Sequence, residues 1–297
     1  MATTGSNVTR SIAQTAQYIQ EKWTRDVQQP FDRILAAAKL VQDRSGLMSD
    51  GGDLLNIPFT GSVNARAKAA STAITYDSPE GTPVTLAVDK HYYVGVLIED
   101  IAKVQSSYDL QAAFKVRMAE ALARQIDTDL MALYASAGTS VAGGAAIDDA
   151  DILAVLAALD ASNTPASQRY GIVGHNTKID LLGINKYNAY DQTGKAGLVT
   201  STKIGNNSSD GGESSLDLLG TVYGLEIYHS GNVPVSTTGR NLFFHKKAIN
   251  LAQQRKPEFH MEYSVDQLGW KTALDTIYGV GVERAASVVE LTRTTAA

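Results

Sequence analysis

Histidine, the residue that most often serves as a metal ligand or general acid–base group, is scarce and scattered in this sequence. The 297-residue chain has no cysteine, so disulfides, thiolate metal sites and cysteine nucleophiles are excluded. None of the histidines has the spacing of HExxH or of another compact metal motif; they are His91, His175, His229, His245 and His260. We expect each to be a surface residue or a hydrogen-bonded core residue, and we expect neither a metal nor a cofactor.

Two glycine-containing stretches resemble nucleotide-binding loops but lack required residues. Thr193-Gly194-Lys195 has the form of the end of a phosphate loop, yet alanines, Ala189 and Ala196, replace its first glycine and its hydroxyl residue. Gly279-Val280-Gly281 is followed by Arg284 where a dinucleotide-binding loop has a third glycine. No GxSxG nucleophile motif occurs. The sequence therefore predicts a protein that is not an enzyme.

The charged residues favour neither tight DNA binding nor a cation site. The chain carries 26 Lys and Arg against 31 Asp and Glu, a formal charge of −5, whereas sequence-independent DNA binding requires an excess of cations. The basic pairs Lys246-Lys247 and Arg255-Lys256 are too sparse for such a surface. Asp148, Asp149 and Asp151 fit the start of a helix, where the dipole favours carboxylates. A protein that only surrounds nucleic acid remains compatible with this balance.

No segment of the sequence is suited to a membrane. The apolar runs are all shorter than the roughly 20 residues that cross a bilayer. Residues 1–10 are polar and lack the apolar stretch of a secretory signal. We therefore expect no membrane partner.

The N-terminal part, residues 8–44, is predicted to be helical. Ile34, Ala38 and Val41 share a helix face, while Pro30 interrupts the pattern. Two helices, or a helix and an arm, are expected here.

Residues 53–100 change to a β-pattern. Alternating apolar residues mark strands at 55–59, 84–88 and 92–98, and residues 76–83 form a turn cluster. Residues 64–73 contain too few large apolar side chains to bury themselves. The segment predicts a long β-hairpin or arm, which would be better suited to packing against a neighbouring subunit than against its own. An ordinary surface hairpin fits this segment equally well.

A long helix is predicted over residues 107–134. Apolar residues recur every three or four positions: Leu110, Phe114, Met118, Leu122, Ile126, Leu130 and Leu133. Ser106 and Asp109 fit a loose capping box. About 28 residues would span about 42 Å, which suits a spine on which other layers pack. Because a row spaced mostly by four drifts around the helix, different sides should be buried along its length.

Helices and short strands alternate from Asp148 onward. Asp148 is expected to cap a helix that stops before Pro165, and Asn176 a second helix; residues 170–173 form a strand between them. Residues 187–215, rich in Gly, Ser and Asn, are expected to form a long interaction loop. Further strands are expected at 218–228, 241–251, 258–265, 270–284 and 288–291.

The order of these elements resembles the major capsid proteins of tailed bacteriophages, which have the Hong Kong 97 fold. The likeness is carried by His91-Tyr92-Tyr93-Val94-Gly95-Val96-Leu97-Ile98-Glu99-Asp100 before the long helix, and by Tyr170-Gly171-Ile172-Val173-Gly174 before the second helix. Leu219-Gly220-Thr221-Val222-Tyr223-Gly224-Leu225 carries it in the late strands, and Tyr278-Gly279-Val280-Gly281-Val282-Glu283-Arg284 in the tail. It spans about residues 8–291.

The resemblance implies an α+β, Hong Kong 97-like fold in five parts: an N-terminal arm (1–52), an extended loop (53–100), the spine helix of a peripheral domain (101–146), an axial domain (147–241) and return strands of the peripheral domain (242–297). Contacts between subunits are then expected in the extended loop, at Arg66, Lys68, Tyr76, Asp77, Ser78, Pro79, Glu80 and Gly81.

The implied function is self-assembly into hexamers and pentamers of an icosahedral shell that encloses phage DNA. The expected partners are other copies of the chain, a scaffolding protein, a portal, a cement protein and packaged DNA through non-specific contact only. The expected location is the virion capsid, with the host cytoplasm during assembly. The alternatives are an encapsulin-like nanocompartment shell, an α+β enzyme with an unrecognised site, and a surface-array protein, which the absence of a signal peptide disfavours.

Overall fold

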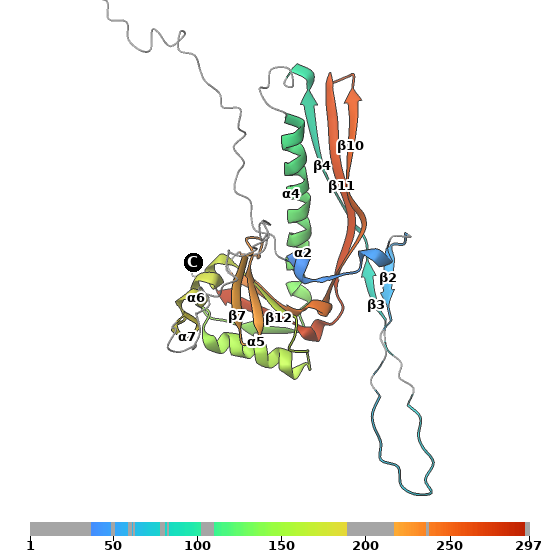
Figure 1. Ribbon diagram of the computed structural model, residues 1–297, viewed down its shortest axis with the longest axis vertical. Coiled ribbons are helices and arrows are strands. Elements are labelled where there is room, and N and C mark those ends of the chain that lie inside the picture. Colours follow the sequence, from blue (N-terminus) through green and yellow to red (C-terminus); the bar gives the residue numbers. More distant parts are fainter. Residues whose placement is uncertain are drawn as a thin grey trace, which may run out of the picture.

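The computed structural model describes residues 37–48, 51–58, 61, 63–77, 81, 83–101, 110–188, 217–235 and 238–294. Two sheets share one long helix, and an arm projects from one of the sheets (Figure 1). The α+β class expected from the sequence is confirmed.

A four-stranded sheet, here called the hairpin sheet, has the order β1-β10-β11-β4. Its strands are β1 (Gln42–Asp43), β10 (Ile249–Ser264), β11 (Gly269–Val282) and β4 (Lys90–Glu99). The helix α4 (Leu110–Met131) runs along one face (Figure 1). Met118 and Leu122 of α4 are buried there with Leu274, against partly buried residues of β4. Side chains of β4 that point the other way, such as Tyr93, are exposed, as the two-residue period of a strand requires.

The second sheet has six strands in the order β5-β12-β9-β6-β8-β7. They are β5 (Thr139–Ala142), β12 (Val288–Thr294), β9 (Thr238–His245), β6 (Arg169–Val173), β8 (Leu225–His229) and β7 (Asp217–Val222). Strand pairing is parallel for β5 with β12 and for β6 with β8, and antiparallel elsewhere. One face of the sheet packs against α5 (Asp149–Ala161) and α6 (His175–Gly183) through Ile152, Val155 and Leu181.

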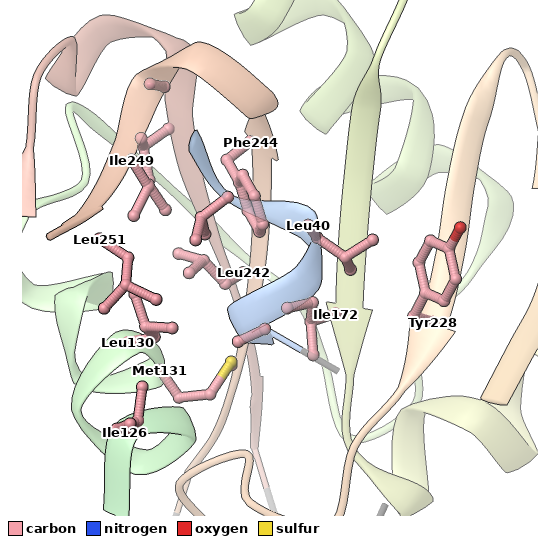
Figure 2. Packing of buried hydrophobic residues seen from close by; sticks show 14 of the residues in the cluster. Leu40, Ile126, Leu130, Met131, Ile172, Tyr228, Leu242, Phe244, Ile249 and Leu251 are labelled. Atoms are coloured by element: carbon pink, nitrogen blue, oxygen red, sulfur yellow. The ribbon is translucent and has the colours of Figure 1, made fainter. Parts of the chain in front are cut away.

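Side chains of consecutive residues in the central strands point to opposite faces of this six-stranded sheet. Phe243 packs on the α5 side, whereas Leu242 and Phe244 join a second core on the other side. That core holds the end of α4 and the helix α2 (Ala37–Leu40), so the two sheets share it. Figure 2 shows Leu40 of α2 among Leu242, Phe244 and Ile172. The drift expected along the long helix is confirmed, because Met118 and Leu122 face one core and Ile126 and Leu130 the other.

The arm begins at a short sheet of β2 (Leu54–Ile57) and β3 (Val84–Ala87). Its root is fixed where Leu86 and Val88 are buried with Met48 and Ala252. Beyond this root, residues 63–77 extend away from both sheets (Figure 1). The remaining described elements are short: η2 (Ser45–Leu47), η3 (Ala132–Ser136), α7 (Asn185–Asn188), η4 (Lys246–Ala248) and η5 (Ala285–Ser287).

Three boundaries expected near the helices are wrong. The N-terminal helix was expected to reach Arg44, but α2 ends at Leu40, where the chain pairs with β10 as β1; Ala38 is exposed while Ala37 is buried. The second short helix begins at His175 after Gly174, without a side-chain cap from Asn176. Tyr187 does not open a loop, since it is buried in α7. Residues 1–36, 102–109 and 189–216 lie outside the described residues, and so do Ser106 and Asp109 of the expected capping box.

Two strands expected to be continuous are divided. The run 218–228 is a hairpin, because Tyr223 and Gly224 both have positive φ, as a type I′ turn requires. The run 241–251 passes from β9 to β10 through η4, so it serves both sheets. A boundary at 241/242 would fall inside β9, and β12 lies in the six-stranded sheet; residues 242–297 therefore contribute strands to both sheets.

Candidate assembly surfaces

The arm is the part of the described chain with the least core of its own. Tyr76 is 84 % exposed, and Val63 and Ile74 are exposed as well. Large apolar side chains in water cost free energy that burial against another surface would recover, at roughly 25 cal/mol per Å². The arm is therefore suited to contact another molecule.

The contact residues predicted from the sequence lie partly within this arm as described. Arg66 and Asp77 form an ion pair of 2.5 Å between the outgoing and returning parts of the arm, and Lys68 and Gly81 also lie in the arm. The described residues form a turn at Ala69–Thr72, where Ser71 has a positive φ. Half of the expected turn cluster 76–83 lies outside the described residues. Ser78, Pro79 and Glu80 lie outside the described residues.

The root of the arm depends on a close approach of two backbones. A Cβ added to Gly279 of β11 would lie 2.1 Å from the carbonyl oxygen of Ala87 in β3. Only glycine allows β3 to lie this close to β11. The Val88 N–H donates a hydrogen bond to the backbone carbonyl oxygen of Asp53 at 2.8 Å, which joins the two parts of the chain at the base of the arm. An open pocket of about 430 Å³ lies beside this root, with Lys90 and Asp129 paired in its wall at 3.2 Å.

A charged cluster lies on the hairpin sheet. The two Asp275 oxygens contact His91 Nε2 at 3.1 Å and His260 Nε2 at 3.0 Å, and Arg255 approaches at 3.2 Å. Burial raises the pKa of Asp275, but these hydrogen bonds and the Arg255 charge outweigh it and hold the pKa below its usual value. The sequence placed His91 and His260 far apart. Strand register brings them together, since both flank β11.

A buried carboxylate joins three elements at the centre of the molecule. Asp127 of α4 accepts hydrogen bonds from the Ala37 N–H at 2.7 Å and from Asn232 Nδ2 at 3.0 Å, with Ser230 Oγ at 3.3 Å. It thus ties α2 and the segment after β8 to the long helix. The sequence signal for this junction is a charged residue among the apolar positions of an amphipathic helix.

A second carboxylate organises one end of the six-stranded sheet. Asp148 and Asp151 form the capping box of α5, which confirms the expected cap. Asp149 accepts from Lys186 Nζ, Tyr187 Oη and Tyr223 Oη at 2.6–2.8 Å. The hydrogen bond from Lys186, followed by that from Tyr187, lowers the pKa of Asp149. Asp149 therefore links α5, α7 and the β7–β8 turn.

Among the positions that the structure describes, no group of three or more His, Cys, Asp and Glu side chains has an arrangement that could hold a metal ion. Within the same positions, no helix is long and apolar enough to span a membrane. The surfaces that stand out are the exposed arm and the exposed side chains of the hairpin sheet, such as Tyr93 and Met261, which suit a structural protein that builds larger assemblies.

The comparisons identify the kind of assembly. Residues 90–291 match the family model described as phage capsid protein. In fold, the chain is similar to a structure from Mycobacterium phage Che8, with a TM-score of 0.75 and 24 % identity over 92 % of this chain and 97 % of that one. It is also similar to the capsid of cyanophage P-SCSP1u (TM-score 0.73, 18 % identity, 94 % of each chain). The mature capsid of bacteriophage PhiM1 gives a TM-score of 0.71 at 14 % identity over 94 % of this chain and 93 % of that one. A search of curated proteins gives no match.

The chain belongs to the phage capsid protein family. It is therefore a phage capsid protein, a structural protein of the virion capsid.

Proposed function

We propose that the chain assembles into hexamers and pentamers in which the arm of each subunit lies against a neighbour. The observation that supports this is the exposure of the arm, whose apolar residues Val63, Ile74 and Tyr76 are left in water by the single subunit. Arg66, Lys68 and Asp77, together with Ser78, Pro79, Glu80 and Gly81, would make the polar contacts. Identical heterologous contacts of this kind close into rings when the rotation between subunits allows.

The parts of the Hong Kong 97 fold can be assigned to the two sheets. The hairpin sheet with α4 would form the peripheral domain, and the six-stranded sheet with α5 and α6 the axial domain, so that β9, β12 and β5 go with the latter. Residues 53–88 would be the extended loop, and the chain before Ala37 the N-terminal arm. Sheet membership supports this division, because strands of one sheet share a core.

The shell would enclose phage DNA, which it would touch without sequence preference. A separate scaffolding protein, a portal and a cement protein are the proposed further partners. The chain would meet the first two during assembly in the host cytoplasm.

The arm contact can be tested with a cross-linker, because the chain has no native cysteine. A Tyr76→Cys variant would carry a photoactivatable group, and assembled shells would contain equal amounts of ¹⁵N-labelled and unlabelled subunits. We expect cross-linked peptides that combine both isotopes, because the arm contacts another copy. The matched control is the same variant kept as unassembled subunits. Cross-links confined to one isotope in assembled shells would contradict the proposal.

A further inference from the structure

An open pocket of about 520 Å³ lies between the N-terminal segment and the turn that joins the two sheets. Its walls come from α2 and β1, from Gln168 before β6, and from η4. Three lysines line it, Lys39, Lys246 and Lys247, together with the amides of Gln42 and Gln168. Ammonium and amide groups are hydrogen-bond donors, so the pocket is suited to an anion.

Hydrogen bonds hold the lysine-bearing wall in place. The Lys246 N–H donates to the Gln168 oxygen at 3.0 Å, and the Lys247 N–H donates to His245 Nδ1 at 3.2 Å. On the opposite wall, β1 pairs with β10, and Leu40 of α2 is buried in the shared core while Lys39 remains exposed. The positions of the lysines are therefore set by the fold rather than by the ends of free loops.

The pocket is positively charged. The one carboxylate in its lining, Asp43, accepts from the Ser45 N–H at 2.8 Å and Ser45 Oγ at 2.5 Å. The lining therefore has more lysines than carboxylates. Within the described part of the chain, no carboxylate lies in ion-pair range of Lys246 or Lys247. Burial, followed by the charges of Lys247, Arg169 and Arg284, lowers the pKa of His245 beneath the turn, as expected in a positive field.

We propose that this pocket binds phosphate groups of the packaged DNA, so that this side of the subunit faces the interior of the shell. The inference rests on the proposed enclosure of DNA. A chain with a formal charge of −5 repels DNA overall, so the side that meets DNA must concentrate cations locally.

The lining favours DNA over an acidic protein as the occupant. Ala38 and Val41 are its only apolar residues, whereas the buried centre of a protein–protein interface is usually more apolar and depleted of charge. Phosphate contacts require charge and donors alone. Two or three such contacts are weak in one subunit. Repetition over many subunits that face the same DNA makes them effective together.

The first test measures binding of a fluorescent DNA duplex to purified subunits by anisotropy, over a range of salt concentrations. The variant is Lys246→Gln/Lys247→Gln. The matched control, Lys256→Gln/Lys271→Gln, removes the same charge from exposed positions of the hairpin sheet. Loss of two phosphate contacts should reduce the slope of log K against log salt by about 1.8, and the control should keep the wild-type slope. Equal slopes for all three proteins would overturn the proposal.

Poly-glutamate provides the second arm of the same experiment. If the Lys246/Lys247 variant lost affinity for poly-glutamate but not for DNA, the pocket would belong to an acidic protein and the DNA assignment would be wrong. We expect the opposite result. DNA binding should depend on the lysine pair, and poly-glutamate should bind more weakly than DNA of equal charge.

The third measurement separates this inference from the proposed function. Lysine acetylation is followed by mass spectrometry in DNA-filled and empty shells. Lys246 and Lys247 should be protected several-fold in filled shells, while Lys256 and Lys271 react alike in both. Shells without this difference would overturn the pocket assignment and leave the shell function intact. A chain that forms no shells would contradict the proposed function itself.

Discussion

At the scale of single residues, carboxylates rather than catalytic groups hold this subunit together. Asp127, Asp149 and Asp275 each bind donors from at least two other elements. The hydrogen bonds that these carboxylates accept compensate for the hydration that their charges lose on burial. Their removal should therefore affect stability before it affects any surface.

Asp127→Ala is expected to destabilise the subunit strongly. The Ala37 N–H and the Asn232 amide would lose a charged acceptor in a buried site, which costs about 3 kcal/mol of unfolding free energy. Urea denaturation of unassembled subunits measures this change. Thr128→Ala, an exposed neighbour on the same helix, is the control and should stay within about 0.5 kcal/mol of wild type. Equal stability of the two variants would show that the Asp127 junction contributes little.

The Asp275 cluster should make the hairpin sheet sensitive to acid. Because the folded protein lowers the pKa of Asp275, the stabilisation is fully present above the unfolded pKa of about 3.9 and is lost as the pH falls through the lower folded pKa. The difference in Tm between wild type and Asp275→Asn should therefore be clear near about pH 5 and shrink towards about pH 3. Asp266→Asn, in the exposed turn between β10 and β11, is the control. A difference that did not change with pH would contradict this account.

At the scale of elements, the arm and its root have separate requirements. The arm has little contact with its own subunit, whereas the root is packed against β11 through Gly279. Changes to the arm should affect assembly, and changes to the root should affect the subunit as well.

Deletion of residues 64–83 should leave the subunit folded and prevent closed shells. The deletion removes exposed chain and keeps β2, β3 and the buried root residues Leu86 and Val88. Thermal unfolding and electron microscopy of the same preparation measure the two outcomes. Normal shells from the deletion variant would show that the arm is not an assembly contact.

Gly279→Ala should displace the root of the arm. Its Cβ would lie 2.1 Å from the Ala87 oxygen, so β3 or β11 must move; we expect a loss of about 1–3 kcal/mol in unfolding free energy. Gly183→Ala is the control, because a Cβ there meets nothing within 4 Å and alanine favours the helix by up to about 1 kcal/mol. A tolerated Gly279→Ala substitution would mean that the close approach is not required.

The elements with strong local patterns could be predicted from the sequence. The alternating residues of β4, the cap of α5 at Asp148 and the periodic residues of α4 each express a local rule. The strand ends around η4 and Pro257 could not be predicted, because they depend on which sheet each strand joins. Strands β9 and β10 belong to different sheets, and β10 continues through Pro257 at a register shift. The arm was predictable from its lack of core, but the Asp275 cluster depends on strand register, which local patterns do not reveal.

At the scale of the whole molecule, apolar side chains are buried in some parts of the chain and exposed in others. Two cores lie on the two faces of the six-stranded sheet, while among the described residues the arm beyond its root and side chains such as Tyr93 of the hairpin sheet are exposed. A chain built in this way leaves exposed surfaces for contact with neighbouring molecules. The family match and the fold similarity agree with that design.

Electron microscopy of the purified protein, expressed alone and with a scaffolding protein, tests the central claim most directly. The account predicts closed shells, or tubes and sheets of regular hexamers, in which the arm density of each subunit overlaps its neighbour. Small discrete particles at every concentration, with or without the scaffolding protein, would contradict it.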